Sequence, residues 1–164
     1  SFITLHMLTN ILDEVSDINN DFKITLWVYP HFKHNLFNDI KKKYKMNIKQ
    51  QKGSSLCERM NNCLLLESSK HEKTILIGSD IPSLTKGTIM NAKHALLKKD
   101  VVIGPSIDGG FYLIGIKGQY KDFIDCMKTM DIQNVKNNIR SHSLDLELLT
   151  ELKDIDKPED LLVI

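Results

Sequence analysis

The sequence has 164 residues, of which 41% are hydrophobic and 26% charged, and its formal net charge is +1 at pH 7. A chain of this size suits one globular domain with a proper core, and its balanced charge excludes a nucleic-acid partner held by bulk positive charge. No apolar run reaches the roughly 20 residues that a membrane helix needs, so we expect no membrane partner. The three cysteines contain no CxxC pair, which argues against a disulfide framework or a zinc site and predicts a cytoplasmic protein.

Helix and strand patterns alternate along the first part of the chain. Apolar residues such as Leu12 and Val15 recur at helical spacing, and the segment before Pro30 is rich in β-branched and aromatic residues. Ser55 and Glu58 form the capping-box pattern that starts a helix. The predicted elements are a helix that begins at residue 2 and closes in residues 17–21, a strand over residues 23–29, a helix over residues 32–45, a short strand over residues 46–50 and a helix over residues 56–68.

The second part continues the alternation with short, continuous apolar strands. Such strands are usually buried on both faces. The predicted elements are strands over residues 74–78, 101–104 and 111–116, helices over residues 85–98 and 120–128, one or two helices between residues 132 and 152, and a last short helix that begins at Pro158. Alternating strands and helices predict a three-layer α/β/α, Rossmann-like fold with a mostly parallel sheet. Ligands of such sheets bind beyond the carboxyl ends of the strands, so the loops there are the candidate sites.

The first such loop, residues 78–82, carries Asp80. A carboxylate at the end of a buried strand needs a metal or a cationic partner, because an unpaired buried charge is costly. Pro82 restricts Ile81 to extended geometry and helps to fix the loop. The alternative is that Asp80 only caps the turn before the next helix.

The second loop, residues 104–110, carries Asp108 beside Gly109 and Gly110. Adjacent glycines allow a ligand to approach the backbone closely. Two aspartates on neighbouring strand ends are hard oxygen ligands that suit Mg²⁺ or Mn²⁺, ions that also bind substrate phosphates. The alternative is an ordinary Asp-Gly hairpin turn between two strands.

The third loop, residues 51–55, contains Gly53 and opens a helix. Such a turn presents backbone N–H groups to an anion, and Arg59 in the first turn of the helix has the reach for a bidentate phosphate contact. The pattern is neither a Walker nor a Rossmann fingerprint. The alternative is a solvent-exposed helix start with Glu58 and Arg59 on its surface.

Four motifs in order, over residues 51–60, 77–82, 104–115 and 154–161, resemble a bacterial GT-A-type glycosyltransferase family of unknown specificity in the nucleotide-diphospho-sugar transferase superfamily. This family is similar in fold to the molybdopterin and phospholactate guanylyltransferases. The resemblance covers the chain from about residue 45 to its end. It implies a GT-A fold in which Asp80 and Asp108 are the catalytic and metal-binding residues, with Mg²⁺ or Mn²⁺ as the cofactor. The nucleotide-binding residues predicted alongside them are Gln51, Gly53, Arg59, Ser79, Gly109 and Gly110.

The sequence departs from this family's pattern in three places. Cys57 stands where the family usually has glycine, and Phe111 where it often has tyrosine. The family also opens with a central strand and a basic, glycine-containing loop, whereas this chain starts inside the first helix. We therefore expect a single GT-A-like domain over residues 1–164 without its first strand, so that the strands at residues 23–29 and 74–78 lose a shared neighbour. Asp154 and Asp156 match the family's last motif, but they could equally only brace the final turn.

The leading hypothesis is metal-dependent glycosyl transfer from a nucleotide-activated sugar to an unknown acceptor, so the expected partner is a nucleotide-sugar or nucleotide substrate. Asp80 and Asp108 would hold the metal against the diphosphate, and Arg59 would assist at the phosphate. Two alternatives remain open: a nucleotidyltransferase of the guanylyltransferase type, and an inactive remnant that acts only as a binding module. The sequence predicts neither the general base nor the oligomeric state.

Overall fold

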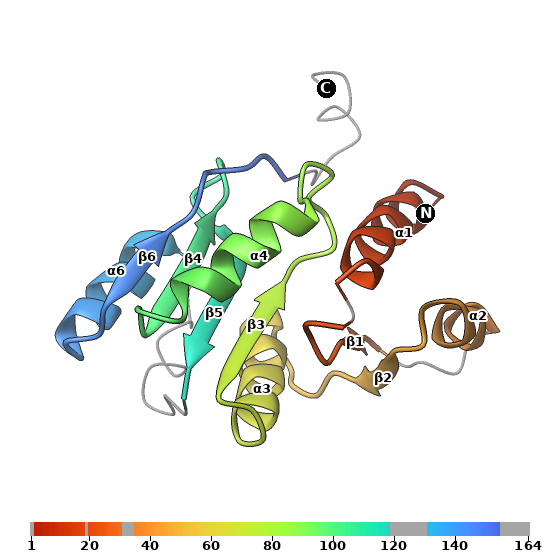
Figure 1. Ribbon diagram of the computed structural model, residues 1–164, viewed down its shortest axis with the longest axis horizontal. Helices are drawn as coiled ribbons and strands as arrows, with labels where there is room; N and C mark the ends of the chain where they lie inside the picture. The colour runs from red at the N-terminus through yellow and green to blue at the C-terminus, as the bar shows by residue number, and fades with distance from the viewer. Residues whose placement is uncertain (1, 19, 31–34, 119–130, 155–164) are drawn as a thin grey trace.

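The computed structural model describes residues 2–18, 20–30, 35–118 and 131–154 (Figure 1). The helices are α1 (Phe2–Ser16), α2 (Asn35–Tyr44), α3 (Leu56–Ser68), α4 (Lys86–Ala95) and α6 (Ile132–Ser141). The strands are β1 (Thr25–Val28), β2 (Asn47–Gln50), β3 (Lys73–Ile77), β4 (Val101–Pro105), β5 (Phe111–Lys117) and β6 (Leu146–Leu148). Within the described part of the chain, no helix has both the length and the apolar character needed to cross a bilayer.

The larger sheet has four strands in the order β3-β5-β4-β6. Strand β5 is antiparallel to both β3 and β4, whereas β6 is parallel to β4. Consequently β3, β4 and β6 run in one direction and β5 alone runs against them. The carboxyl ends of β3 and β4 therefore lie at the same edge of the sheet.

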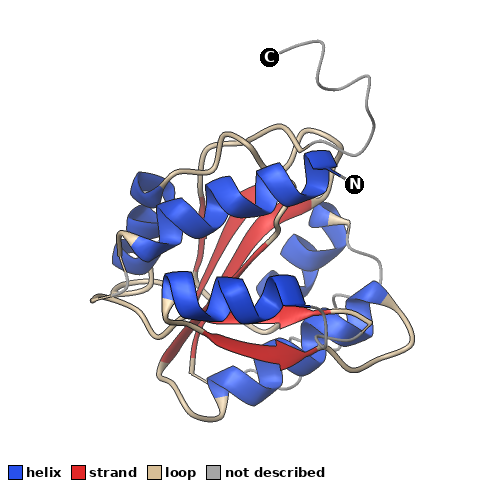
Figure 2. Cartoon of the chain, turned by 90° about the vertical axis from the view of Figure 1, so that its right-hand side faces the viewer, coloured by secondary structure: helices blue, strands red, loops and turns tan. Residues whose placement is uncertain are grey.

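Helices cover both faces of this sheet, which confirms the predicted three-layer α/β/α architecture (Figures 1 and 2). On one face α4 packs against the sheet through a hydrophobic cluster that includes Leu96, Val102 and Leu113. On the other face α3 and α6 contribute to a second cluster that includes Leu64 and Val135. The core thus consists of one apolar layer above the sheet and one below it.

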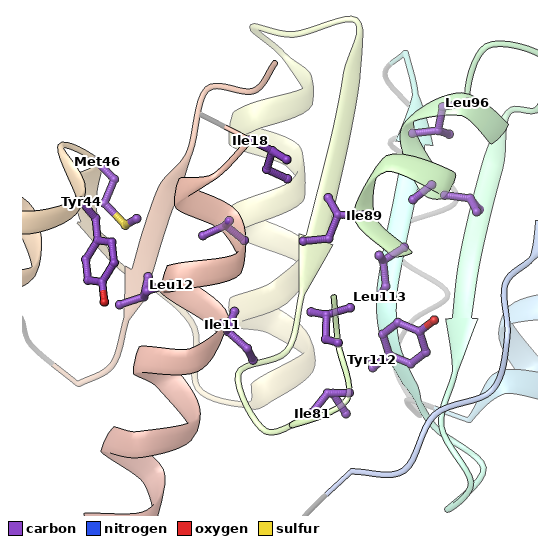
Figure 3. Close-up of a cluster of buried hydrophobic side chains, with 14 of the residues drawn as sticks. Ile11, Leu12, Ile18, Tyr44, Met46, Ile81, Ile89, Leu96, Tyr112 and Leu113 are labelled. Atoms are coloured by element: carbon purple, nitrogen blue, oxygen red, sulfur yellow. The ribbon is translucent and has the colours of Figure 1, made fainter. Parts of the chain in front are cut away.

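Strands β1 and β2 form a separate two-stranded parallel sheet beside the larger one (Figure 1). In the described residues, β1 pairs only with β2 and β3 pairs only with β5, as expected for two strands without a shared neighbour. Helix α1 joins the two sheets through side chains: Ile11 and Leu12 belong to the same buried cluster as Met46, next to β2, and Ile81, just after β3 (Figure 3). Hydrophobic burial rather than a backbone ladder therefore connects the sheets.

The burial of the strands follows from their places in the sheet. Strands β4 and β5 are buried along almost their whole length, as their apolar sequences predict. Every residue of β3 is only half-buried, so the prediction of complete burial is wrong for this strand. The reason is that β3 has β5 on one side and no paired strand on the other among the residues described.

One strand was not expected from the sequence. Only α6 lies in the part of the chain predicted to hold one or two helices before residue 152, and β6 follows it. The residues around β6 read Leu144-Asp145-Leu146-Glu147-Leu148, an alternation typical of a strand, and β6 lies beside the buried strand β4. The predicted helices over residues 120–128 and from Pro158 lie outside the described residues.

The predicted helix starts are confirmed for α3 and α4. The Ser55 Oγ accepts a hydrogen bond from the Glu58 N–H at 3.2 Å, and Thr85 caps α4 in the same way. The second half of the expected capping box is shifted by one residue, because the Glu58 carboxylate accepts the Ser54 N–H at 2.7 Å. These local contacts fix where both helices begin.

The packing of β4 against β5 generates a first prediction. Gly104 is buried, and a methyl group in place of its hydrogen would overlap the ring of Tyr112. We expect Gly104→Ala to lower the free energy of unfolding by about 1–3 kcal/mol, measured by urea denaturation, since overpacking displaces buried side chains.

The matched control is Gly87→Ala, on the exposed surface of α4. No atom lies closer than 3.5 Å to a Cβ at this position, and alanine is the better helix former by about 0.5–1 kcal/mol. This variant should be as stable as the wild type or more so. If the two variants have equal free energies of unfolding, the Tyr112 ring can move away from the added methyl group without loss of stability.

Candidate functional site

The two predicted aspartates lie in loops at the same edge of the larger sheet. Asp80 follows β3, and Asp108 lies in the turn from β4 to β5. The start of β5 separates the two loops, and the Gly78 N–H donates to the Tyr112 carbonyl at 2.9 Å across it. The topology therefore brings both acids to one edge of the sheet, on either side of β5.

The Asp108 loop is a hairpin turn, so the hairpin interpretation of this segment is confirmed for its local geometry. The Asp108 Oδ1 accepts a hydrogen bond from the Ser106 Oγ at 2.6 Å and from the Gly110 N–H at 2.9 Å. These donors, the Ser106 hydroxyl above all, lower the pKa of Asp108 below its usual value. Since Ser106 is buried and Asp108 is exposed, a fixed hydroxyl holds an ionised carboxylate at the surface.

Backbone hydrogen bonds from three parts of the chain hold this loop in place. Within the loop, the Gly109 N–H donates to the Ser106 carbonyl at 3.0 Å. The Ile132 N–H, at the start of α6, donates to the Gly109 carbonyl at 3.0 Å, and the Ile107 N–H donates to the Leu152 carbonyl at 3.1 Å. Gly109 has a φ of +92°, a conformation that L side chains rarely adopt. The loop thus has a fixed shape that requires glycine at this position.

A third acid, Asp154, reaches the same edge of the sheet. The segment after β6 runs along the end of β4, where the Leu152 N–H donates to the Pro105 carbonyl at 3.0 Å. Two residues further on, the Asp154 side chain is in hydrogen-bond contact with Asp108 and makes the smallest contribution to the lowered pKa of Asp108. The last predicted motif therefore does meet the Asp108 loop. Its second acid, Asp156, lies outside the described residues.

Asp80 is half-buried and lies close to the end of its own strand. A Cβ at Gly78 would lie 2.7 Å from the Asp80 Oδ1, so glycine at position 78 leaves room for this carboxylate. Ile81, which is 1% exposed, anchors the loop in the core (Figure 3). The N-cap of α4 is Thr85, so Asp80 is not the residue that caps this helix. Ser79 is exposed beside it.

The donor chemistry of these loops suits a hard divalent cation. Among the residues that the structure describes, no three His, Cys, Asp or Glu side chains form a cluster able to hold a metal ion. Mg²⁺ does not need such a cluster, because it usually binds through one or two carboxylates, several waters and substrate phosphates. Asp80 and Asp108 supply carboxylates of this kind, so their chemistry fits the expected ion.

The third predicted loop lies next to the end of β3. Helix α3 packs on β3 and is joined to it by a short turn, so the start of α3 lies near the carboxyl end of that strand. Gly53 has a φ of +137°, and a Cβ there would come within 2.8 Å of the Arg59 N, so the loop lies tightly on the helix start. Of the other predicted residues, Gln51 donates from its Nε2 to the Trp27 carbonyl at 3.1 Å. Arg59 stacks on the ring of Tyr29, with 4.0 Å from its Cζ to the ring centroid.

The start of α3 already carries a negative charge. The Glu58 carboxylate accepts hydrogen bonds from the Ser54 N–H and Oγ, both at 2.7 Å, and these donors lower the pKa of Glu58. A phosphate at this point would compete with Glu58 for the Ser54 donors. This geometry agrees with the alternative of an exposed helix start for Glu58 but not for Arg59, which is half-buried. Arg59 stays the phosphate-binding candidate of this loop.

Three residues that lie against predicted site residues were not themselves predicted: Ser106 beside Asp108, Gly78 beside Asp80 and Tyr29 beside Arg59. The serine lies two positions before an aspartate in a turn, a spacing that favours a local hydrogen bond. The glycine and the tyrosine follow strands, which is the only signal that the sequence offers for them. A separate groove of about 460 Å³ lies between α4 and residues 147–150, and neither predicted aspartate lines it.

Comparisons with known proteins agree with this fold. The family model described as "uncharacterized protein conserved in bacteria (DUF2064)" matches residues 15–132. A solved structure named as a candidate nucleotide-diphospho-sugar transferase, from Desulfovibrio desulfuricans G20, has a TM-score of 0.82 and 24% identity, over 95% of this chain and 70% of that chain. No curated protein matches the sequence.

Two further solved structures have a similar fold. The 4-diphosphocytidyl-2C-methyl-D-erythritol synthase of Anaerococcus prevotii has a TM-score of 0.73 at 13% identity, over 96% of this chain and 86% of that chain. The molybdopterin-guanine dinucleotide biosynthesis protein A of Archaeoglobus fulgidus has a TM-score of 0.50 at 11% identity, over 93% and 82% of the two chains. The resemblance to nucleotide-diphospho-sugar transferases is therefore confirmed at the level of the fold.

The Ser106–Asp108 contact generates a second prediction. In Ser106→Ala the carboxylate loses its strongest donor, so the pKa of Asp108 should rise toward the usual value of about 3.9, measured by NMR titration of the side-chain carboxyl carbon without metal. Ser141→Ala, which removes a hydroxyl bonded to the Asn138 carbonyl on α6, is the control and should leave this pKa unchanged.

The stability of the protein should follow the same titration. A lowered pKa in the folded state contributes stability that is present above the usual carboxyl pKa and is lost as the pH falls through the folded value. The part of the difference between wild type and Ser106→Ala that depends on this charge should therefore shrink below about pH 4. If the pKa of Asp108 is unchanged in Ser106→Ala, the Ser106 hydroxyl does not stabilise the ionised form of Asp108.

Proposed function

Since the chain belongs to the DUF2064 family and shares its fold with nucleotide-diphospho-sugar transferases, we propose that it catalyses metal-dependent glycosyl transfer from a nucleotide-activated sugar to an acceptor. The observation that carries the proposal is the placement of Asp80 and Asp108 at one sheet edge, on the ends of two strands that run in the same direction. This edge is where α/β sheets bind ligands.

Each of the predicted metal and phosphate ligands has a role in the proposed reaction. Asp80 and Asp108 would hold Mg²⁺ or Mn²⁺, which when bound neutralises the negative charge that develops on the leaving diphosphate. Ser106 and the Gly110 N–H keep Asp108 ionised, as a metal ligand must be. Arg59 would contact a phosphate, and among the described residues no carboxylate forms an ion pair with its guanidinium.

Nucleotidyl transfer is the second candidate, because a solved structure of similar fold is named a cytidylyltransferase. The two reactions differ in the bond that breaks. In glycosyl transfer the acceptor attacks the anomeric carbon, and a nucleoside diphosphate leaves. In nucleotidyl transfer the acceptor attacks the α-phosphorus of a nucleoside triphosphate, and pyrophosphate leaves. Both leaving groups carry a developing negative charge that a cation held by the same acids would stabilise.

A third prediction tests the metal site by isothermal titration calorimetry with nucleoside diphosphates, in MgCl₂ and in EDTA. Wild type should bind more tightly with magnesium, and Asp80→Ala or Asp108→Ala should abolish this difference. Loss of an outer-shell partner alone typically costs about 10–100-fold in metal affinity, so loss of a ligand should cost at least as much.

The control for this experiment is Asp39→Ala, which removes an exposed carboxylate on α2. It should bind like the wild type. If the magnesium-dependent affinity survives in both Asp80→Ala and Asp108→Ala, the assignment of the two acids is wrong.

A fourth prediction separates the two reactions by their products. Incubation with a panel of nucleotide sugars and candidate acceptors should release a nucleoside diphosphate, detected by ion-exchange chromatography. Release of pyrophosphate from a nucleoside triphosphate would establish nucleotidyl transfer instead. If nucleotides bind and neither product forms, the result would favour the third hypothesis, that of a binding module.

A further inference from the structure

We infer that Tyr29 is a stacking platform for the base of the bound nucleotide and that its partner Arg59 marks the phosphate side of the same site. This inference rests on the proposed function and adds to it a base-binding residue that no sequence motif indicates. It concerns the end of β1, where Tyr29 follows the last residue of the strand.

The Tyr29 ring is in contact with a cation and is also largely exposed. The Arg59 guanidinium lies over one face, with its Cζ 4.0 Å from the ring centroid. Even with this contact, 56% of the residue is exposed, and Tyr29 is the one exposed aromatic among the residues whose burial is described. A ring supported on one side and open to solvent is a surface on which a planar base can stack, because such stacking tolerates any base.

The stack holds Arg59 without neutralising it. Its Nε is buried and has no hydrogen-bond partner among the described groups. The ring attracts the guanidinium through its quadrupole, so the charge is held in place but not paired. A fixed cation with unused donors suits a phosphate, which arginine can bind in a bidentate way.

This pair lies at the edge of the molecule that carries the acids. Arg59 is in the first turns of α3, whose start lies near the carboxyl end of β3 and so near Asp80. The contact across the ring brings the end of β1 to the same place. A nucleotide with its base on Tyr29 and a phosphate at Arg59 would therefore extend toward the predicted metal ligands.

The alternative is that the stack only joins two parts of the fold. Each role predicts a different dependence on the ligand. A purely structural contact would affect all ligands alike, through the stability of the loop. A base platform affects only ligands that carry a base, whereas Arg59 affects every ligand that carries a phosphate.

The experiment compares magnesium complexes of ADP, GDP, CDP and UDP with magnesium pyrophosphate, which has no base, by isothermal titration calorimetry. Tyr29→Leu should weaken binding of the preferred nucleotide by about ten-fold more than it weakens binding of pyrophosphate, because one base–aromatic stack is lost in addition to the support of Arg59. Tyr29→Phe, which keeps the ring, should bind like the wild type. Arg59→Met should weaken nucleotide and pyrophosphate alike.

Three results would overturn the inference, and they differ in what else they overturn. If wild type binds nucleotides and Tyr29→Leu binds them equally well, Tyr29 does not stack on the base, and the proposed function is unaffected. The same holds if Tyr29→Leu loses pyrophosphate and nucleotide to the same degree, since the contact is then structural. If wild type binds neither nucleotide nor pyrophosphate in the presence of magnesium, the proposed function falls together with the inference.

Discussion

The antiparallel pairing of β4 with β5 is the interaction on which the rest of the structure depends. These two strands are the most completely buried in the sheet, and the remaining strands attach to them, β3 to β5 and β6 to β4. Helices cover them on both faces. Because the pair is antiparallel, a tight turn must connect the strands, and the turn carries Asp108 at the sheet edge where β3 also ends. The hairpin is thus both the centre of the core and the reason that two acids meet at one edge.

The Asp108 carboxylate is held by a buried side-chain hydroxyl and a backbone N–H. Glycines at positions 78 and 110 leave room for the carboxylates of Asp80 and Asp108, and Ser106 donates to Asp108 from a buried position. The segment after β6 adds Asp154 from a distant part of the sequence. The contact with Asp154 contributes to the lowered pKa of Asp108, so it helps to keep the Asp108 carboxylate ionised. An ionised carboxylate is the form that a cation requires of its ligand.

The features that the sequence predicted correctly depend on local signals. Ser55 and Thr85 cap helices that begin where expected, and the apolar runs of β4 and β5 are buried because their composition leaves no polar face. The strand β6 was missed because its three residues follow a helix, although the alternating leucines around it were a readable signal. The contact between Tyr29 and Arg59 could not be predicted, because it joins the end of β1 to α3, and their distance apart depends on how the β1–β2 sheet lies against that helix.

The fold limits the chemistry without selecting the reaction. Glycosyl and nucleotidyl transfer both require charge neutralisation at a diphosphate. Carboxylates at a sheet edge, with an arginine nearby that forms no ion pair with the residues the structure describes, suit either one. What separates the reactions is the position of the attacked atom relative to that charge, the anomeric carbon beyond the β-phosphate or the α-phosphorus next to the ribose. That position depends on where the base is held. A platform at Tyr29 would fix the base at one end of the nucleotide, so the distance from this ring to the acids would decide which bond lies over the metal. The choice between the two reactions therefore depends on the base site as much as on the acids.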